Sequence, residues 1–178
     1  MIIDEGIVFR HAAEKDAGTL VALYDAAARW MRASGIDQWK PGEKDAAHFT
    51  ARMRDGEVWI AADADGRVAG AYELWWCDEE AWGVQPPVAG YVHRLMVERE
   101  TAPAGTGRRM LEHAERRIAR TGRERARLDC LSTNPRLLAY YQGAGYRVVG
   151  EFPHKEGTDG RVYGVILLEK RLDQLTLV

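Results

Sequence analysis

The chain has 178 residues, with 25 basic and 27 acidic side chains and a formal net charge of −2. Hydrophobic residues make up 46% and charged residues 29%, a balance typical of a globular protein and not of a disordered one. No apolar run approaches the roughly 18 residues of a membrane helix, and the N-terminus lacks the pattern of a secretory signal. The two cysteines exclude a disulfide framework or a zinc knuckle. We expect a single cytoplasmic domain over residues 1–178, with no membrane partner and no metal.

Eight arginines lie between Arg108 and Arg127. Glu112, Glu115 and Glu124 are interleaved with them, so both signs of charge alternate along the segment. This mixture predicts a solvated helix face, or an anion site at the first turn of that helix. It does not have the pattern of a nucleic-acid stripe, and we expect no nucleic-acid partner.

The first half of the chain predicts a strand, two helices and a hairpin. Residues 8–12 form the strand, and Asp16 is the expected N-cap of a helix whose apolar residues recur at helical spacing as far as Met31. Residues 34–42 break that helix, and a second short helix follows over residues 46–53 and closes near Gly56. Two strands, 57–63 and 67–76, are then joined by an Ala-Asp-Gly turn.

The second half alternates strands with helices. A loop over residues 77–87 precedes the following expected elements: strand 90–97, a helix with Met110, Leu111, Ala114 and Ile118 on one face, strand 126–132, helix 135–142, and strands 146–152 and 162–170. Strands followed by helices imply a partly parallel, mixed α/β sheet.

Residues 95–118 contain a strand, a turn with Gly105 and Gly107, and a helix. Main-chain N–H groups at a helix start, together with the positive end of the helix dipole, favour phosphate binding. Two nucleotide motifs are excluded here, because a P-loop needs Gly-Lys-Ser/Thr and a dinucleotide fingerprint needs a third glycine where Met110 stands.

Residues 128–146 contain a strand, Asn-Pro, a short helix ending in two tyrosines, and Gly-Ala-Gly-Tyr. Together with Val97 and residues 102–107, the spacing of Asn134, Tyr141 and Gly145-Tyr146 closely resembles the GNAT superfamily of acetyl-coenzyme A-dependent N-acetyltransferases. The order of elements resembles that family over essentially the whole chain. The resemblance implies a central mixed, mostly antiparallel sheet of about seven strands flanked by about four helices.

The resemblance also implies acetyl-coenzyme A as the acyl donor. It places the following residues at the cofactor: Leu95, Met96, Val97, Pro103, Ala104, Gly105, Thr106, Gly107, Arg108, Arg109, Asn134 and Tyr141. Asn134 has a structural alternative as a helix cap. The chain departs from the family pattern at Ala102, where a glutamine or arginine is usual, and at Pro103, which lacks a main-chain donor.

By the same resemblance, Tyr141 protonates the departing thiolate, for which a phenol that stays protonated at neutral pH is suited. Tyr140 points elsewhere on the helix and is expected in the core. Three side chains are candidates for the general base: His93, Asp129 and Glu73. Asp129 has the alternative of a salt-bridged strand residue beside Arg127, and an amine that binds deprotonated needs no base.

Aromatic residues concentrate in the first half of the chain and are expected to line the acceptor site, with core packing as their alternative. The expected acceptor residues are Trp30, Trp39, Tyr72, Glu73, Trp75 and Trp82. Aromatic rings beside acidic groups favour a small cationic amine. The rival functions are a non-catalytic coenzyme A-binding module and a peptide or protein N-acetyltransferase. Dimers are common in the family, so a homodimer is also expected.

Overall fold

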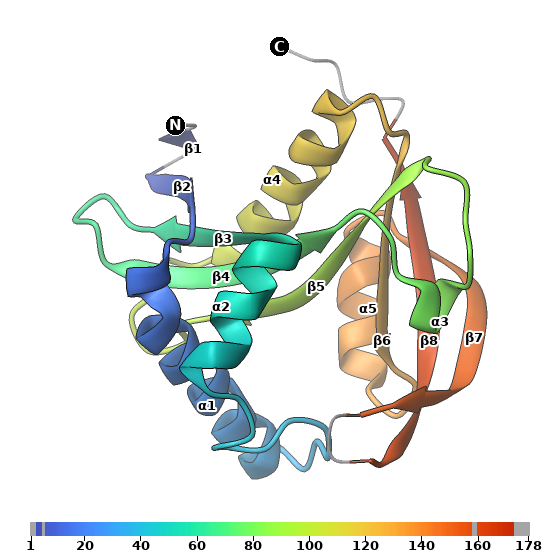
Figure 1. Ribbon diagram of the computed structural model, residues 1–178, viewed down its shortest axis with the longest axis horizontal. Coiled ribbons are helices and arrows are strands. Elements are labelled where there is room, and N and C mark those ends of the chain that lie inside the picture. The colour runs from blue at the N-terminus through green and yellow to red at the C-terminus, as the bar shows by residue number, and fades with distance from the viewer. Residues whose placement is uncertain (1–2, 5, 158–159, 173–178) are drawn as a thin grey trace. The chain divides into compact units, whose positions relative to one another are not determined.

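The computed structural model describes residues 3–4, 6–157 and 160–172 (Figure 1). The chain forms two compact units. Unit 1 comprises Met1–Leu74 and Arg94–Ala114, and unit 2 comprises Trp75–His93 and Glu115–Val178. Strand β5 (Ala89–Val97) and helix α4 (Thr106–Arg120) each begin in one unit and end in the other. The expectation of a single domain stays a prediction.

Unit 1 contains an antiparallel ladder of four strands. In order across the ladder they are β1 (Ile3–Asp4), β2 (Ile7–His11), β3 (Glu57–Ala62) and β4 (Val68–Trp75). The predicted hairpin between β3 and β4 is confirmed. Its turn is held by Asp63, whose carboxylate accepts the main-chain N–H groups of Asp65 and Arg67 at 2.9 Å each.

Two long helices lie side by side in unit 1, α1 (Ala17–Ala33) and α2 (Ala46–Asp55) (Figure 1). Asp16 occupies the predicted N-cap position of α1, but its carboxylate makes no capping bond to that helix. It belongs to a preceding 3-10 turn, η1 (Glu14–Asp16), and binds the Arg10 guanidinium at 2.7 Å. Helix α2 is capped by Asp45, which accepts the N–H of His48 at 2.8 Å.

The core of unit 1 joins these helices to the strands. Its buried members are Leu20, Leu23, Tyr24, Ala28, Phe49, Val58, Ile60, Ala71 and Met96. A side chain at Gly70 of β4 would clash here, because a Cβ would lie 2.5 Å from the Met96 carbonyl oxygen and 2.9 Å from the Met110 sulfur. This close approach packs the first turns of α4 against the end of β5.

Unit 2 contains the parallel part of the sheet. Strand β6 (Arg125–Leu131) runs parallel to β5 and antiparallel to β8 (Val162–Arg171), and β8 pairs antiparallel with β7 (Arg147–Glu156). The prediction of a mixed, mostly antiparallel sheet is confirmed. The structure has one strand more than the sequence predicted, the two-residue β1.

Two helices belong wholly to unit 2. Helix α5 (Pro135–Gly143) starts with a proline in its first turn, as predicted. The stretch expected as a loop contains a short helix, α3 (Glu79–Trp82). Asp78 caps α3 by accepting the N–H of Ala81 at 3.3 Å.

Candidate active site

Strand β5 is interrupted by a bend at Arg94, which has φ of 50°. Among the described residues it is the one non-glycine residue with a positive φ, and such a conformation costs of order 1–3 kcal/mol. Leu95, Met96 and Val97 follow directly in the strand. The N–H of Glu98 donates to the carbonyl of Ala69 at 2.8 Å. Alternation along a strand therefore directs the N–H of Val97 to the opposite edge.

The loop before α4 opens its main chain to ligand. Gly105 has φ of 81°, and a Cβ there would meet nothing within 4 Å. Thr106 is buried, and its hydroxyl donates to the Pro103 carbonyl at 2.6 Å, which fixes the loop. The N–H of Gly107 lies in the first helical turn, where no carbonyl of the same helix precedes it. Main-chain donors at a helix start are suited to binding an anion such as phosphate.

The remaining residues predicted in this loop also lie around the helix start. Pro103 and Ala104 are exposed before it, and Arg108 and Arg109 are half-buried in its first turn. The Arg108 guanidinium pairs with Glu112 at 3.0 Å. Two positive side chains therefore accompany the main-chain donors at this end of α4.

Helix α5 carries the Asn134 and Tyr141 pair in unit 2. The side-chain oxygen of Asn134 accepts the N–H of Leu137 at 3.2 Å, so its capping alternative is observed. Tyr141 is buried, whereas Tyr140 is 40% exposed. The expectation that Tyr140 is the core residue is therefore wrong. Tyr146 packs against Tyr141 with ring centroids 6.0 Å apart.

The Tyr141 hydroxyl is held in its protonated form. Burial above all raises the pKa of Tyr141, and the nearby Tyr140, Cys130 and Asp129 raise it further. Within the described ranges, this hydroxyl makes no hydrogen bond to another residue. A buried phenol in this state is a proton donor and not a base.

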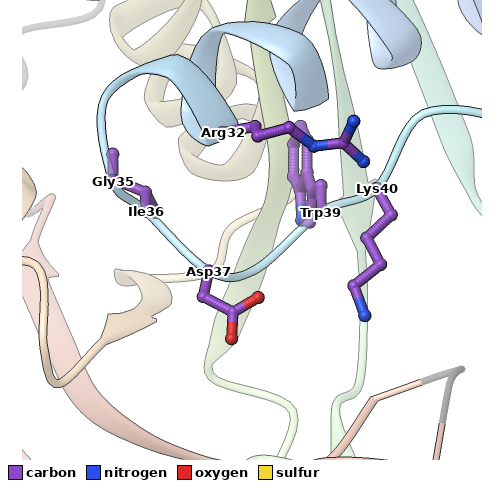
Figure 2. Close-up of a pocket in the computed structure, with 6 residues that line it drawn as sticks. All are labelled: Arg32, Gly35, Ile36, Asp37, Trp39 and Lys40. Atoms are coloured by element: carbon purple, nitrogen blue, oxygen red, sulfur yellow. The ribbon is translucent and has the colours of Figure 1, made fainter.

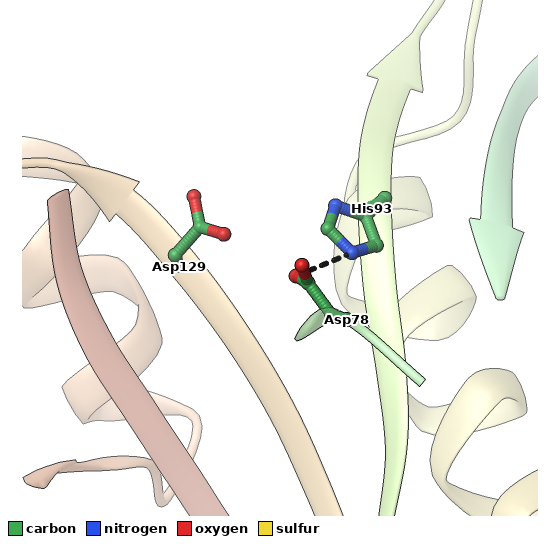
Figure 3. Close-up of side chains that lie close together, drawn as sticks. All are labelled: Asp78, His93 and Asp129. Atoms are coloured by element: carbon green, nitrogen blue, oxygen red, sulfur yellow. Dashed lines mark ion pairs between the residues drawn. The ribbon is translucent and has the colours of Figure 1, made fainter. Parts of the chain in front are cut away.

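A second cluster in unit 2 contains His93, Asp78 and Asp129 (Figure 3). His93 Nε2 lies 3.0 Å from Asp78 Oδ2, and Asp129 binds Lys155 Nζ at 2.8 Å. Burial alone would raise the pKa of Asp78, but hydrogen bonding to His93 and the charges of His93 and Lys155 lower it below its usual value. Asp129 is ion-paired, as one of the two sequence alternatives predicted, but its partner is Lys155 and not Arg127. Arg127 pairs with Glu169 at 2.9 Å.

The ligand atoms of His93, Asp78 and Asp129 lie within 4.8 Å of one another. This spacing is short enough for one cation to reach all three. The His93 contact and the Lys155 ammonium already compensate the two carboxylates. The arrangement therefore suits an imidazole oriented by a carboxylate.

Glu73, a candidate both for base and for attraction of a cationic amine, is only 1% exposed in unit 1. Its carboxylate binds Arg52 Nε at 2.6 Å and lies 3.1 Å from Arg94 Nη1. Two guanidinium groups therefore balance its charge within the protein. These surroundings disfavour Glu73 both as a general base and as a group that attracts a cationic amine.

Tyr72, expected at the acceptor site, lies in the core instead. It is fully buried, and its hydroxyl is 2.6 Å from His113 Nδ1. The His113 ring stacks on Phe9 with centroids 4.0 Å apart. Its hydrogen bond satisfies a buried polar group, so Tyr72 has a structural role.

Three tryptophans expected at the acceptor site lie in separate surroundings. Trp30 is 37% exposed, with the guanidinium carbon of Arg99 3.5 Å from its ring centroid. Trp82 packs with the Arg127 guanidinium 4.8 Å from its ring centroid. Trp75 is half-buried at the end of β4. Trp30 belongs to unit 1, whereas Trp75 and Trp82 belong to unit 2.

Trp39 lines a pocket of about 230 Å³ at the end of α1 (Figure 2). The pocket is lined by Arg32, Gly35, Ile36, Asp37, Trp39 and Lys40. In Figure 2 the side chains of Arg32, Trp39 and Lys40 are grouped at one end of the loop, and Gly35 and Ile36 lie at the other. Trp39 also stacks on Tyr24 with ring centroids 4.9 Å apart. Of the expected aromatic residues, Trp39 is the one placed in this pocket.

Sequence reasoning placed Asp78 among the acidic residues of the acceptor pocket and did not predict its pairing with His93. It also missed Arg52 and Arg94 as partners of Glu73. Asp78 had a detectable signal, because an aspartate before two glutamates is typical of a helix start. Arg52 lies on the buried side of a short helix, 21 residues from its partner Glu73. No local pattern predicts a positive φ at an arginine, so Arg94 gave no signal.

No helix in the described part of the chain is long and apolar enough to cross a membrane. The family model described as Acetyltransferase (GNAT) family matches residues 20–146. The chain is 31% identical over 156 residues to an uncharacterized N-acetyltransferase, YesJ, of Bacillus subtilis strain 168, covering 83% of this chain and 86% of that protein.

Solved structures show the same fold. A GNAT-family acetyltransferase from Listeria monocytogenes 4b F2365 matches with a TM-score of 0.73 and 26% identity, covering 93% of this chain and 94% of that one. YncA of Salmonella typhimurium, a putative acetyltransferase solved with its cofactor acetyl-CoA, matches with a TM-score of 0.66 and 18% identity, covering 96% of each chain.

Proposed function

The chain belongs to the GNAT acetyltransferase family, and from this premise we propose that its acceptor is a small molecule with a primary amine. The protein is an N-acetyltransferase that uses acetyl-coenzyme A. The observation that carries the proposal is the pocket of about 230 Å³ beside Trp39. Its volume suits a small organic group and is below the usual range for larger ligands.

Bound acetyl-coenzyme A supplies an acetyl thioester. In the proposal the main chain of Leu95 and Met96 holds the pantetheine arm, and residues 103–109 hold the phosphates. Val97 donates its N–H to the carbonyl oxygen as negative charge develops there. The support is the Glu98 N–H, which donates to Ala69, so that alternation turns the Val97 N–H to the other edge of β5. Asn134 caps α5 through its oxygen, and its amide NH₂ donates to the cofactor.

Two side chains move protons in the proposal. His93 removes a proton from the amine: with Nε2–H donated to Asp78, Nδ1 is the accepting atom. Tyr141 donates its proton to the departing sulfur, which its raised pKa supports. Asp129 and Glu73 are not assigned the base role, because each is already ion-paired.

Acetyl transfer to small amines and to peptides tests the acceptor class. The protein is incubated with acetyl-coenzyme A and either a set of small primary amines or short peptides with free N-termini and lysines. Product is followed by mass, so hydrolysis is not counted. We expect kcat/KM for the best small amine to exceed that of every peptide. A peptide preferred over all small amines would contradict the proposal.

A further inference from the structure

Arg94 combines a strained main chain with a side chain that is held on several sides. Its φ of 50° lies in the left-handed region that favours glycine, and an arginine keeps this conformation only when its surroundings compensate the cost. The residue stands in β5 directly before Leu95. Strained residues are concentrated at functional sites, so this one is a reason to look for a function.

The Arg94 guanidinium makes two short polar contacts with other elements of unit 1. Its Nη1 lies 3.1 Å from Glu73 Oε2 on β4 and 2.7 Å from His48 Nε2 on α2. The Glu73 side chain is only 1% exposed. Removing one partner of a buried ion pair is strongly destabilising, because the other charge stays buried. The guanidinium is therefore held close to β4 and α2.

The contact with His48 has a defined direction. Burial first, and then the charge of Arg94, lower the pKa of His48 to about 4, so the imidazole is neutral near neutral pH. A guanidinium has only hydrogen-bond donors. His48 Nε2 therefore accepts the hydrogen bond from Arg94, and the proton of the neutral ring is on Nδ1.

Two aromatic rings flank the same guanidinium. Its central carbon lies 5.6 Å from the ring centroid of Tyr24 and 5.6 Å from that of Phe49, within the range of a cation–π contact. Tyr24 is in α1 and Phe49 is in α2, and both are buried. The head group of Arg94 is thus held by side chains from α1, α2 and β4.

The main chain that follows the bend is the part placed at the pantetheine arm. Before the bend, β5 pairs with β6 from Ala89 to Tyr91. After the strand, the N–H of Glu98 donates to the Ala69 carbonyl at 2.8 Å. Residues 95–97 lie between these bonded segments and start directly after Arg94. The φ of Arg94 therefore sets the direction in which their main chain leaves the bend.

We propose that Arg94 is a positioning residue for acetyl-coenzyme A: its held side chain maintains the left-handed bend, and the bend presents the main chain of residues 95–97 to the pantetheine arm. This inference rests on the proposed function for the place of that arm. Glu73 and His48 then act on the cofactor through Arg94. Without the side chain, residue 94 relaxes toward an ordinary strand conformation, and coenzyme A has to restore the bend at a cost in affinity.

Replacing Arg94 by alanine and by glycine separates the side-chain contacts from the bend. Both variants lose the same contacts and leave the same remaining groups around Glu73. Only alanine bears the steric cost of a positive φ, because glycine adopts it readily. Arg94→Ala should weaken coenzyme A binding roughly 10- to 100-fold. Arg94→Gly should recover at least about threefold of that loss, because the bend stays accessible.

Calorimetric titration with two ligands locates the effect. Coenzyme A is compared with adenosine diphosphate, which has the two linked phosphates but no pantetheine arm. We expect Arg94→Ala to weaken binding of coenzyme A and to leave that of adenosine diphosphate close to the wild type. An equal loss for both ligands would overturn the proposal. If adenosine diphosphate binds too weakly to titrate, the comparison of glycine with alanine decides the case.

Arg127 is the matched control for the loss of a buried arginine. Its side chain is 8% exposed, pairs with Glu169 at 2.9 Å, and has its guanidinium carbon 4.8 Å from the Trp82 ring centroid and 5.8 Å from that of Tyr91. Its φ is not positive, so glycine has no advantage there and weakens the strand. The urea midpoint of Arg127→Gly should be no higher than that of Arg127→Ala, whereas Arg94→Gly should have a higher midpoint than Arg94→Ala.

A second background keeps the test decisive if Arg94→Ala does not fold. Both substitutions are then combined with Glu73→Gln, which removes the buried carboxylate that has lost a cationic partner. We again expect tighter coenzyme A binding with glycine than with alanine. These titrations need no acceptor, so a failure of amine transfer would overturn the proposed function alone. Coenzyme A binding that is equal in the glycine and alanine variants, or tighter with alanine, would overturn this inference alone.

Discussion

Tyr141 and Tyr140 are neighbours in sequence with different surroundings. The first is buried and the second is 40% exposed, and only the first lies seven residues after Asn134. The spacing that identified Tyr141 could be read from sequence. Which tyrosine is buried could not, because it depends on the face that α5 turns toward Tyr146.

Tyr141→Phe keeps the ring and removes only the proton donor. If the hydroxyl protonates the departing sulfur, the turnover number should fall roughly 10²–10⁴-fold. Coenzyme A affinity should change little, because the charge on sulfur develops during the reaction. Steady-state kinetics and calorimetry measure the two effects. Tyr140→Phe is the control and should retain most of the turnover; a larger loss there than at Tyr141 would move the acid role to Tyr140.

The bend at Arg94 also belongs to the residue scale. A strand could be predicted over residues 90–97, and the structure places β5 over Ala89–Val97. Arg94, which has the positive φ in this strand, contacts Glu73 and His48, which lie far away in the sequence. Such contacts have no signature in a local pattern.

At the scale of elements, the loop and first turn of α4 form the phosphate site of the proposal. Gly107→Glu introduces bulk and negative charge among main-chain N–H groups expected to face phosphate. We expect coenzyme A affinity, measured by calorimetry, to fall at least tenfold. Gly18→Glu is the matched control, because Gly18 lies in the first turn of α1 and a Cβ there meets nothing within 4 Å. Unchanged affinity in Gly107→Glu would remove this loop from the account.

Helix α2 contains a histidine that the fold keeps neutral. The folded-state pKa of His48 is lowered to about 4, below the roughly 6.5 of an unperturbed histidine. The stability gained by keeping His48 neutral is fully present above the pKa of His48 in the unfolded chain. It is lost as the pH falls toward the pKa of His48 in the folded protein. His48→Gln should therefore reduce the drop in unfolding free energy between about pH 7 and about pH 5.

Urea unfolding at the two pH values measures that change. His154→Gln is the matched control, since His154 is an exposed histidine in β7. An unchanged acid drop in His48→Gln would contradict the depressed pKa.

Most elements could be predicted from sequence. For each element that could not be predicted, a physical reason can be identified. Alternating and helical periodicities located the long strands and helices. Helix α3 escaped because four residues are too few to show a period. Asp16 is at the predicted N-cap position of α1, but its carboxylate pairs with Arg10 on β2 and does not cap the helix. Local preference is overridden there by a charge from another element.

At the scale of the whole molecule, the near-neutral net charge of −2 concealed how charge is arranged inside. The sequence suggested an acidic acceptor pocket around Glu73, but Arg52 and Arg94 surround that carboxylate. Both arginines are distant from it in sequence or on another strand. The charges that surround Glu73 could therefore be known only from the three-dimensional structure.

The central claim is that the protein transfers acetyl from acetyl-coenzyme A to a small primary amine. The most direct measurement follows free thiol and acetylated amine in the same reaction, with and without amine. We predict thiol release that depends on the amine and yields one acetylated product for each thiol. Coenzyme A binding without amine-dependent thiol release for any amine or peptide would contradict the claim and favour a non-catalytic coenzyme A-binding module.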